Sequence, residues 1–101
     1  MPEEETGSTP ETWYVYILEC RGGKLYTGIT NDLARRYDKH AAGKGAIYTR
    51  LNPPVCMLAC QVCADKSEAA RSEYRLKQLS RARKLEWVNA HAGNLALIMT
   101  E

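Results

Sequence analysis

The stretch that decides the fold is residues 13–30, Trp-Tyr-Val-Tyr-Ile-Leu-Glu-Cys-Arg-Gly-Gly-Lys-Leu-Tyr-Thr-Gly-Ile-Thr. Its first eight residues are rich in aromatic and β-branched side chains, which favours a strand. The Arg-Gly-Gly tripeptide that follows signals a turn, and residues 24–30 have the composition of a returning strand. The stretch therefore predicts an antiparallel hairpin, with Tyr16 on one strand and Tyr26 on the other.

The length of the turn decides whether the two tyrosines meet. A two-residue turn at Gly22-Gly23 would place Tyr16 and Tyr26 on opposite faces of the hairpin, because side chains alternate along a strand. A three-residue turn over 22–24, or a glycine bulge, would place both on one face. Convergence of the tyrosines therefore requires an odd-length turn or a bulge.

The rest of the chain alternates helical and extended patterns. A helix through Ala42 can be capped by Thr30 or Asn31, a loop covers 43–54, and a third strand covers 55–63. Two further helices are expected, one capped by Asp65 or Ser67 and running to about Leu79, the other over 81–91. The fold class is α+β, a small three-stranded antiparallel sheet flanked by helices in the order β-β-α-β-α-α. We expect three aromatic residues of this domain in its core: Trp13, Trp87 and Tyr74.

Length and composition indicate one soluble domain with two tails. The chain has 101 residues, of which 45% are hydrophobic and 26% charged. Residues 1–12 predict a disordered acidic tail, 13–93 the domain, and 94–101 a C-terminal tail. The start of the chain lacks the features of a signal peptide, and the apolar run at 95–99 is too short to span a bilayer, so we expect a cytoplasmic protein.

The net charge of +2 conceals a basic domain. Residues 1–12 contain four acidic residues and no base, so 13–101 hold 14 basic and 8 acidic residues, a net charge of +6. A basic domain favours nucleic acid or another polyanion as its partner, but charge alone is explained more simply by a solvated basic surface.

Four cysteines offer a possible zinc site, Cys20, Cys56, Cys60 and Cys63. The last three lie within one predicted strand, which would turn Cys60 and Cys63 to opposite faces. Cysteine is commonly a buried apolar residue, so core thiols are favoured over a metal site.

Several motifs in order resemble the GIY-YIG nuclease superfamily. They are Val15-Tyr16-Ile17, Tyr26-Thr27-Gly28, Asp32-x3-Arg36-x3-His40 and the helical segment 71–79 that bears Glu73. The resemblance covers residues 13 to about 88 and is strongest to small stand-alone bacterial members similar to the YhbQ-type proteins. Arg36 and His40 share a helix face at their spacing of four.

The resemblance implies hydrolysis of a DNA phosphodiester with Mg²⁺ or Mn²⁺. By analogy Glu73 holds the metal, Tyr16 or Tyr26 helps to activate water, Arg36 stabilises the charge on the phosphate, and His40 assists proton transfer. Single-stranded, branched or damaged DNA are all possible substrates. The alternative is a nucleic-acid-binding module with this fold and little turnover.

The resemblance also sets structural expectations. Five residues should line one concave face: Tyr16, Tyr26, Arg36, His40 and Glu73. A phosphate-tracking surface would use Arg35, Lys39, Lys44, Arg50, Arg71 and Arg75. Ile29 occupies a position where many members carry lysine, and Asn89 and Asn94 are candidates for a supporting asparagine.

Simpler structural roles exist for the same residues. Tyr16 and Tyr26 could be ordinary strand aromatics, and His40 could be favoured by the helix dipole. Glu73 could pair with Lys77 across one helical turn. The order and spacing of the motifs favour the site.

Overall fold

The computed structural model describes residues 12–95. The expected hairpin forms from β1 (Trp13–Cys20) and β2 (Lys24–Thr30), and the third strand is β3 (Pro54–Cys63). The helices are α1 (Leu33–Ala41), α2 (Ile47–Leu51), α3 (Lys66–Lys77) and α4 (Arg81–His91). The predicted tail over residues 1–12 lies outside the described part apart from Thr12, as does the C-terminal stretch from residue 96 onward.

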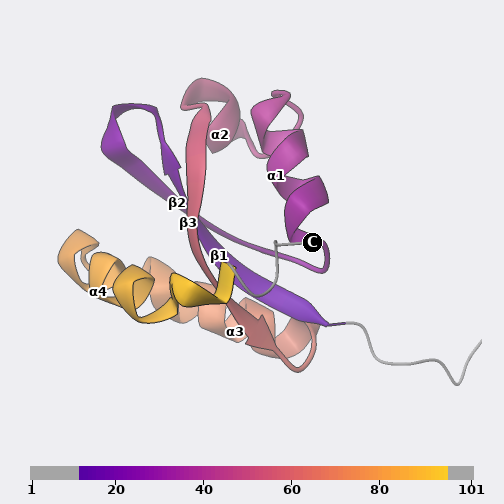
Figure 1. The fold of residues 1–101 in the computed structure, drawn as a ribbon, viewed down its shortest axis with the longest axis vertical. Coiled ribbons are helices and arrows are strands. Elements are labelled where there is room, and N and C mark those ends of the chain that lie inside the picture. The colour runs from indigo at the N-terminus through magenta and orange to yellow at the C-terminus, as the bar shows by residue number, and fades with distance from the viewer. Residues whose placement is uncertain (1–11, 96–101) are drawn as a thin grey trace, which may run out of the picture.

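The three strands form one antiparallel sheet in the order β2-β1-β3, which makes β2 an edge strand. Helices α1 and α2 lie on one face of the sheet, and α3 and α4 lie on the other (Figure 1). The predicted α+β class with a three-stranded antiparallel sheet is therefore confirmed, with one additional short helix.

The hairpin turn has three residues, the short 3-10 helix η1 (Arg21–Gly23). Gly22 and Gly23 both adopt positive φ, at +78° and +75°, which glycine tolerates without a Cβ penalty. The resulting register pairs Tyr16 with Gly28 and Leu18 with Tyr26. Of the alternatives left open, the turn has the odd length that convergence requires, although it covers 21–23 and not 22–24, and it places Tyr16 and Tyr26 on one face.

Alternation along the strands divides the core into two layers. Val15, Ile17 and Ala59 pack toward α3 and α4. Tyr16 and Leu18 pack toward α1 with its residue Leu33. The face that carries the two tyrosines is therefore the one covered by α1.

Three local details differ from the sequence-based expectation. Asp32 caps α1 by accepting from the Arg35 N–H, in place of Thr30 or Asn31. The predicted loop at 43–54 contains the five-residue helix α2. Asp65 caps α3, which ends at Lys77, before the expected Leu79.

The expectation that Tyr74 belongs to the core is wrong. Helix α3 buries Ala69 and Leu76, seven residues apart, and this spacing turns Tyr74 outward to 68% exposure. Trp13 and Trp87 do pack against the core as predicted.

The chain after α4 returns to the sheet. The Asn94 side-chain amide donates to the Cys60 carbonyl at 2.8 Å, and Leu95 packs on the α1 side of the sheet. Within residues 12–95, no helix is long and apolar enough to cross a membrane.

Candidate functional site

The centre of the site is a chain of hydrogen bonds buried between β1, α1 and α2. The Tyr16 hydroxyl lies 2.9 Å from Nε2 of His40. Nδ1 of His40 lies 2.7 Å from the Thr49 hydroxyl, which in turn donates to the Ala46 carbonyl at 2.9 Å. Tyr16, His40 and Thr49 are all essentially inaccessible to solvent.

This network assigns the protons. The single Thr49 hydroxyl proton is donated to Ala46, so Thr49 accepts from Nδ1–H of His40. Nε2 of a neutral His40 is then a bare acceptor, and the Tyr16 hydroxyl donates to it. Proton donation therefore runs in one direction, from Tyr16 through His40 to Thr49 and the α2 backbone.

The electrostatics keep both rings neutral near pH 7. Burial, reinforced by the charge of Arg36, lowers the pKa of His40 to about 4. Burial raises the pKa of Tyr16 to about 12, and the nearby Arg36 guanidinium offsets part of this increase. In the free protein the proton therefore stays on the phenol of Tyr16, which donates it in a hydrogen bond to the neutral imidazole of His40.

Two glycines allow this close approach. A Cβ on Gly28 would lie 2.5 Å from the Tyr16 hydroxyl oxygen, so the Tyr16 ring lies across the bare backbone of β2. A Cβ on Gly45 would overlap the imidazole of His40. These contacts place the hydroxyl of Tyr16 against the backbone of the edge strand β2, where the side chain remains buried.

Tyr26 stands beside this pair. Its ring centroid lies 5.2 Å from that of His40 and 6.4 Å from that of Tyr16, and it is half-buried. On its other side, Tyr26 packs against the ring of Tyr48 at 5.8 Å.

Arg36 connects the hydrogen-bonded chain to a basic pocket. It is half-buried on α1, one turn before His40, and influences the pKa of both Tyr16 and His40. A pocket of about 310 Å³ opens between the end of β2 and the start of α1, where Arg35, Arg36 and Lys39 supply the positive charge. These groups can bind a phosphate.

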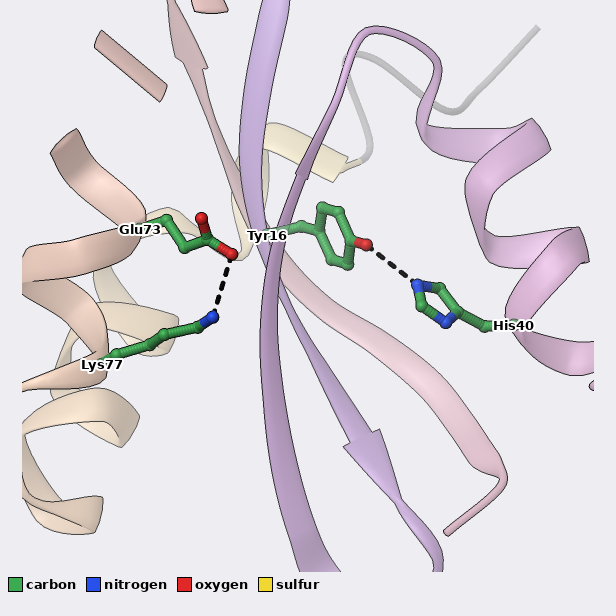
Figure 2. A network of polar contacts seen from close by, with 4 residues as sticks. All are labelled: Tyr16, His40, Glu73 and Lys77. Atoms are coloured by element: carbon green, nitrogen blue, oxygen red, sulfur yellow. Dashed lines mark hydrogen bonds and ion pairs between the residues drawn. The ribbon is translucent and has the colours of Figure 1, made fainter. Parts of the chain in front are cut away.

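Glu73 reaches the site from the opposite side of the sheet. Tyr16 and His40 lie on the α1 side, whereas Glu73 extends from α3 (Figure 2). Four residues after buried Ala69 and three before buried Leu76, Glu73 lies on the sheet-facing side of α3, and its side chain is only 23% exposed. Its charge contributes to the raised pKa of Tyr16.

The expected single concave face stays a prediction, because Glu73 extends from the other side of the sheet while its charge acts on Tyr16. Four of the five residues lie on the α1 side of the sheet, and Glu73 approaches the edge strand β2 from the α3 side, because Ala69 and Leu76 anchor α3 there. Glu73 also pairs with Lys77 at 3.1 Å, the simpler role considered for it.

The remaining sequence candidates lie farther from the hydrogen-bonded chain. The six predicted phosphate-contacting residues are all exposed, four of them on the α1–α2 side (Arg35, Lys39, Lys44 and Arg50) and two on α3 (Arg71 and Arg75). Asn94 bonds to β3, and Asn89 is exposed on α4.

The cysteines do not form a zinc site. Cys60 packs on the α1 side and Cys63 on the α3 side, as the strand alternation predicted. Burial raises the pKa of Cys60 to about 11, which disfavours the thiolate that zinc requires. In the described part of the chain, His, Cys, Asp and Glu form no group of three or more suited to a metal.

Sequence reasoning missed Thr49 and the two close-packed glycines. The segment Gly45-Ala46-Ile47-Tyr48-Thr49 lies only a few residues after His40, but it resembles a loop because its apolar residues have no helical period. The short separation of this segment from His40 in the sequence was the signal that could have identified Thr49 as a partner of His40.

Comparison with known proteins assigns the family. Residues 12–86 match the GIY-YIG catalytic domain. The chain belongs to the GIY-YIG family. The family is one of nucleases, and its domain is a nucleic-acid-binding one.

Several proteins similar to this chain carry the name UPF0213. A UPF0213 protein of Xanthomonas axonopodis pv. citri is 55% identical over 78 residues, 77% of this chain and 76% of the relative. One from Xanthomonas campestris pv. campestris is 52% identical over 81 residues, 80% of this chain and 79% of the relative. The solution NMR structure of UPF0213 protein BH0048 from Bacillus halodurans shares 49% identity, covering 81% of this chain and 87% of that one with a TM-score of 0.53.

Proposed function

We propose that this chain is a metal-dependent endonuclease that hydrolyses DNA phosphodiester bonds at the β2 edge. The observation that carries the proposal is the Tyr16 hydroxyl, donating at 2.9 Å to a buried, neutral His40 beside Arg36. A phenol fixed by a neutral imidazole next to a guanidinium suits phosphoryl transfer, which depends on positioning and charge neutralisation.

Tyr16 is favoured over Tyr26 as the group that activates water. Tyr16 would accept a proton from the attacking water as it passes its own proton to Nε2 of His40. This transfer requires substrate binding to bring the two pKa values together, because they are about 12 for Tyr16 and about 4 for His40 in the free protein. The hydroxide forms the new bond to phosphorus while the bond to the leaving oxygen breaks. Arg36 would neutralise the charge on the phosphate, and Tyr26 would hold the His40 ring in place.

Glu73 is the residue that would hold the divalent ion. One carboxylate suits Mg²⁺ or Mn²⁺, which retains several waters and takes further oxygens from a substrate phosphate. When bound, the ion would supply Lewis-acid stabilisation of the phosphate and the leaving oxygen. Lys77 currently neutralises the Glu73 carboxylate and would have to release it.

Cleavage of defined DNA substrates tests the proposal. Purified protein with Mg²⁺ or Mn²⁺ should cut at least one of single-stranded, nicked, branched or duplex oligonucleotides. Glu73→Gln and Arg36→Ala should each reduce the rate at least about a hundredfold, in keeping with the loss of one electrostatic group at a transition state. Arg83→Ala is the control, because Arg83 lies on exposed α4 and pairs only loosely with Glu86 at 3.8 Å.

Two outcomes would reject the endonuclease. One is the absence of cutting on every substrate, and the other is equal cutting by Glu73→Gln and the parent. Salt-dependent DNA binding without cleavage would instead support the binding-module alternative.

A further inference from the structure

Helix α2 presents an exposed apolar face beside the proposed active site. Ile47 is 69% exposed, Leu51 is 75% exposed and Tyr48 is 39% exposed, while Thr49 on the same helix is buried against His40. Solvent-facing apolar residues clustered in this way mark an interaction surface. We call Ile47, Tyr48 and Leu51 the α2 platform.

The α2 platform is continuous with the catalytic rings. Tyr48 packs one side of its ring on Tyr26 at 5.8 Å with the planes tilted by 31°, and Tyr26 in turn packs on His40 at 5.2 Å. The bond from His40 to Thr49 fixes α2 relative to the site. The Tyr48 ring is therefore held in contact with the aromatic residues of the proposed active site.

The positive charge around the α2 platform favours an anionic partner. No acidic residue occurs between Asp38 and Asp65, whereas Lys44 and Arg50 flank the α2 platform and are exposed. A second copy of the chain would bring like charges together at this surface, and an anionic strand would meet opposite charge. Apolar and aromatic contacts surrounded by cations are typical of single-stranded nucleic-acid binding.

The edge strand β2 connects the α2 platform with the basic pocket and so indicates the course of a bound nucleic-acid strand. Tyr48 lies near Tyr26 at the start of β2, and the basic pocket of about 310 Å³ lies at its end near Thr30. At about 3.4 Å per residue these two positions are about 13 Å apart, on either side of the Tyr16 hydroxyl above Gly28. One strand can lie along β2 with a phosphate in the pocket and a base on the platform.

We propose that Tyr48, flanked by Ile47 and Leu51, is a subsite that stacks one unpaired base of the nucleic acid next to the bond to be cut. Bases within a duplex are covered on both faces, so only an unpaired or terminal base can lie on the Tyr48 ring. This subsite rests on the proposed function and specifies the substrate as a strand unpaired at that position.

Binding measured without divalent metal tests the subsite independently of cleavage. Fluorescence anisotropy would compare a single strand, a duplex, and a single strand with abasic positions. Tyr48→Ala and Tyr48→Leu should weaken binding of the intact single strand about tenfold or more, because stacking one base on an aromatic ring is worth roughly 1–3 kcal/mol. Tyr48→Phe should bind as the parent does, and binding to the abasic strand should be insensitive to all three variants.

Tyr74→Ala is the matched control, since Tyr74 is an exposed tyrosine beside Arg71 on α3, on the other side of the sheet. It should leave binding within about twofold of the parent. The salt dependence should be unchanged in Tyr48→Leu and reduced in Arg50→Gln, which removes a charge.

The subsite is wrong if Tyr48→Leu binds the intact strand as tightly as the parent does. It is also wrong if Tyr48→Leu weakens binding of the intact and abasic strands by the same factor. It is also wrong if sedimentation shows a dimer that Leu51→Glu abolishes, because the platform would then bind a second copy. Cleavage with no effect of Tyr48→Leu on binding would refute the subsite alone. If Tyr48→Leu weakens binding of the intact single strand as expected, but the parent protein cleaves no substrate, the proposed function is wrong and the subsite stands.

Discussion

At the scale of single residues, the direction of the hydrogen bonds matters more than the identity of the groups. A tyrosine next to a histidine is ambiguous, because either ring can donate. Thr49 removes the ambiguity, since its one proton is donated to Ala46 and it can only accept from His40. A residue that contacts no substrate thus determines which tautomer faces Tyr16.

Thr49→Val tests this role at nearly constant volume. The variant leaves Nδ1–H of His40 without an acceptor, so we expect the other tautomer to become populated and the cleavage rate to fall about tenfold to a hundredfold. Nitrogen NMR shifts of the His40 ring should report the tautomer directly. Thr49→Ser keeps the hydroxyl and should restore both the parent shifts and the rate. An unchanged His40 spectrum in Thr49→Val would contradict the assignment.

Gly28→Ala tests the close approach of Tyr16 to the edge strand. The added methyl group would lie 2.5 Å from the hydroxyl oxygen of a fully buried ring, so Tyr16 must move away from His40. We expect a loss of about 1–3 kcal/mol in the free energy of unfolding, measured in urea, together with loss of cleavage. Gly93→Ala is the control because its Cβ would meet no atom within 4 Å. Equal stability of Gly28→Ala and the parent would contradict the close contact between the Tyr16 ring and the backbone at residue 28.

At the scale of elements, α3 contributes a carboxylate that is already paired. The Glu73–Lys77 contact is an i,i+4 pair, and such pairs contribute about 0.3–0.5 kcal/mol. On the proposed function, metal binding at Glu73 would have to overcome the favourable energy of this ion pair. The pair would therefore reduce the metal affinity of the free protein without abolishing it.

Lys77→Met should accordingly bind Mn²⁺ about twofold more tightly than the parent in the absence of nucleic acid. A titration followed by electron paramagnetic resonance measures this, and Glu73→Gln should abolish the site. Arg83→Met changes a comparable pair on α4 and should have no effect. Equal Mn²⁺ affinity in Lys77→Met and the parent would show that the ion pair does not compete with metal.

The elements also show how far sequence reasoning reached. The hairpin could be predicted because its aromatic and β-branched strands enclose a glycine turn. Whether Tyr16 and Tyr26 share a face could not, because the sequence left the length of the turn open. Helix α2 could not, because Ile47 and Leu51 point outward and no side chain caps its start. Motif spacing located Glu73, but spacing carries no information about which face of the sheet α3 covers.

At the scale of the whole molecule, a buried neutral histidine couples stability to pH. The pKa of His40 is about 4 in the folded protein and about 6.5 in an unfolded chain. As the pH falls below 6.5, His40 becomes protonated in the unfolded chain but stays neutral in the folded protein. The free energy of unfolding therefore decreases until about pH 4, where His40 is protonated in the folded protein as well. The site that the proposed chemistry requires is thus also an acid-sensitive point in the fold.

We expect His40 to account for about 2–3 kcal/mol of the stability lost between pH 6.5 and pH 4. Urea unfolding at a series of pH values would compare the parent with His40→Gln, in which this contribution is absent. The carboxylates titrate in both proteins, so their contribution cancels when the free energies of unfolding of the parent and His40→Gln are subtracted at each pH. His91→Gln is the control, since His91 is partly exposed on α4. Parallel pH profiles for the parent and His40→Gln would contradict the buried neutral imidazole.

The placement of Glu73 across the sheet has a consequence during synthesis. A growing chain produces Tyr16, Tyr26, Arg36 and His40 first, and the hairpin and α1 could gather them while residue 73 is still being added. On the proposed mechanism this early half lacks its metal ligand, which arrives only when α3 docks on the far face. A nascent chain would therefore be unable to cut DNA until both layers had folded.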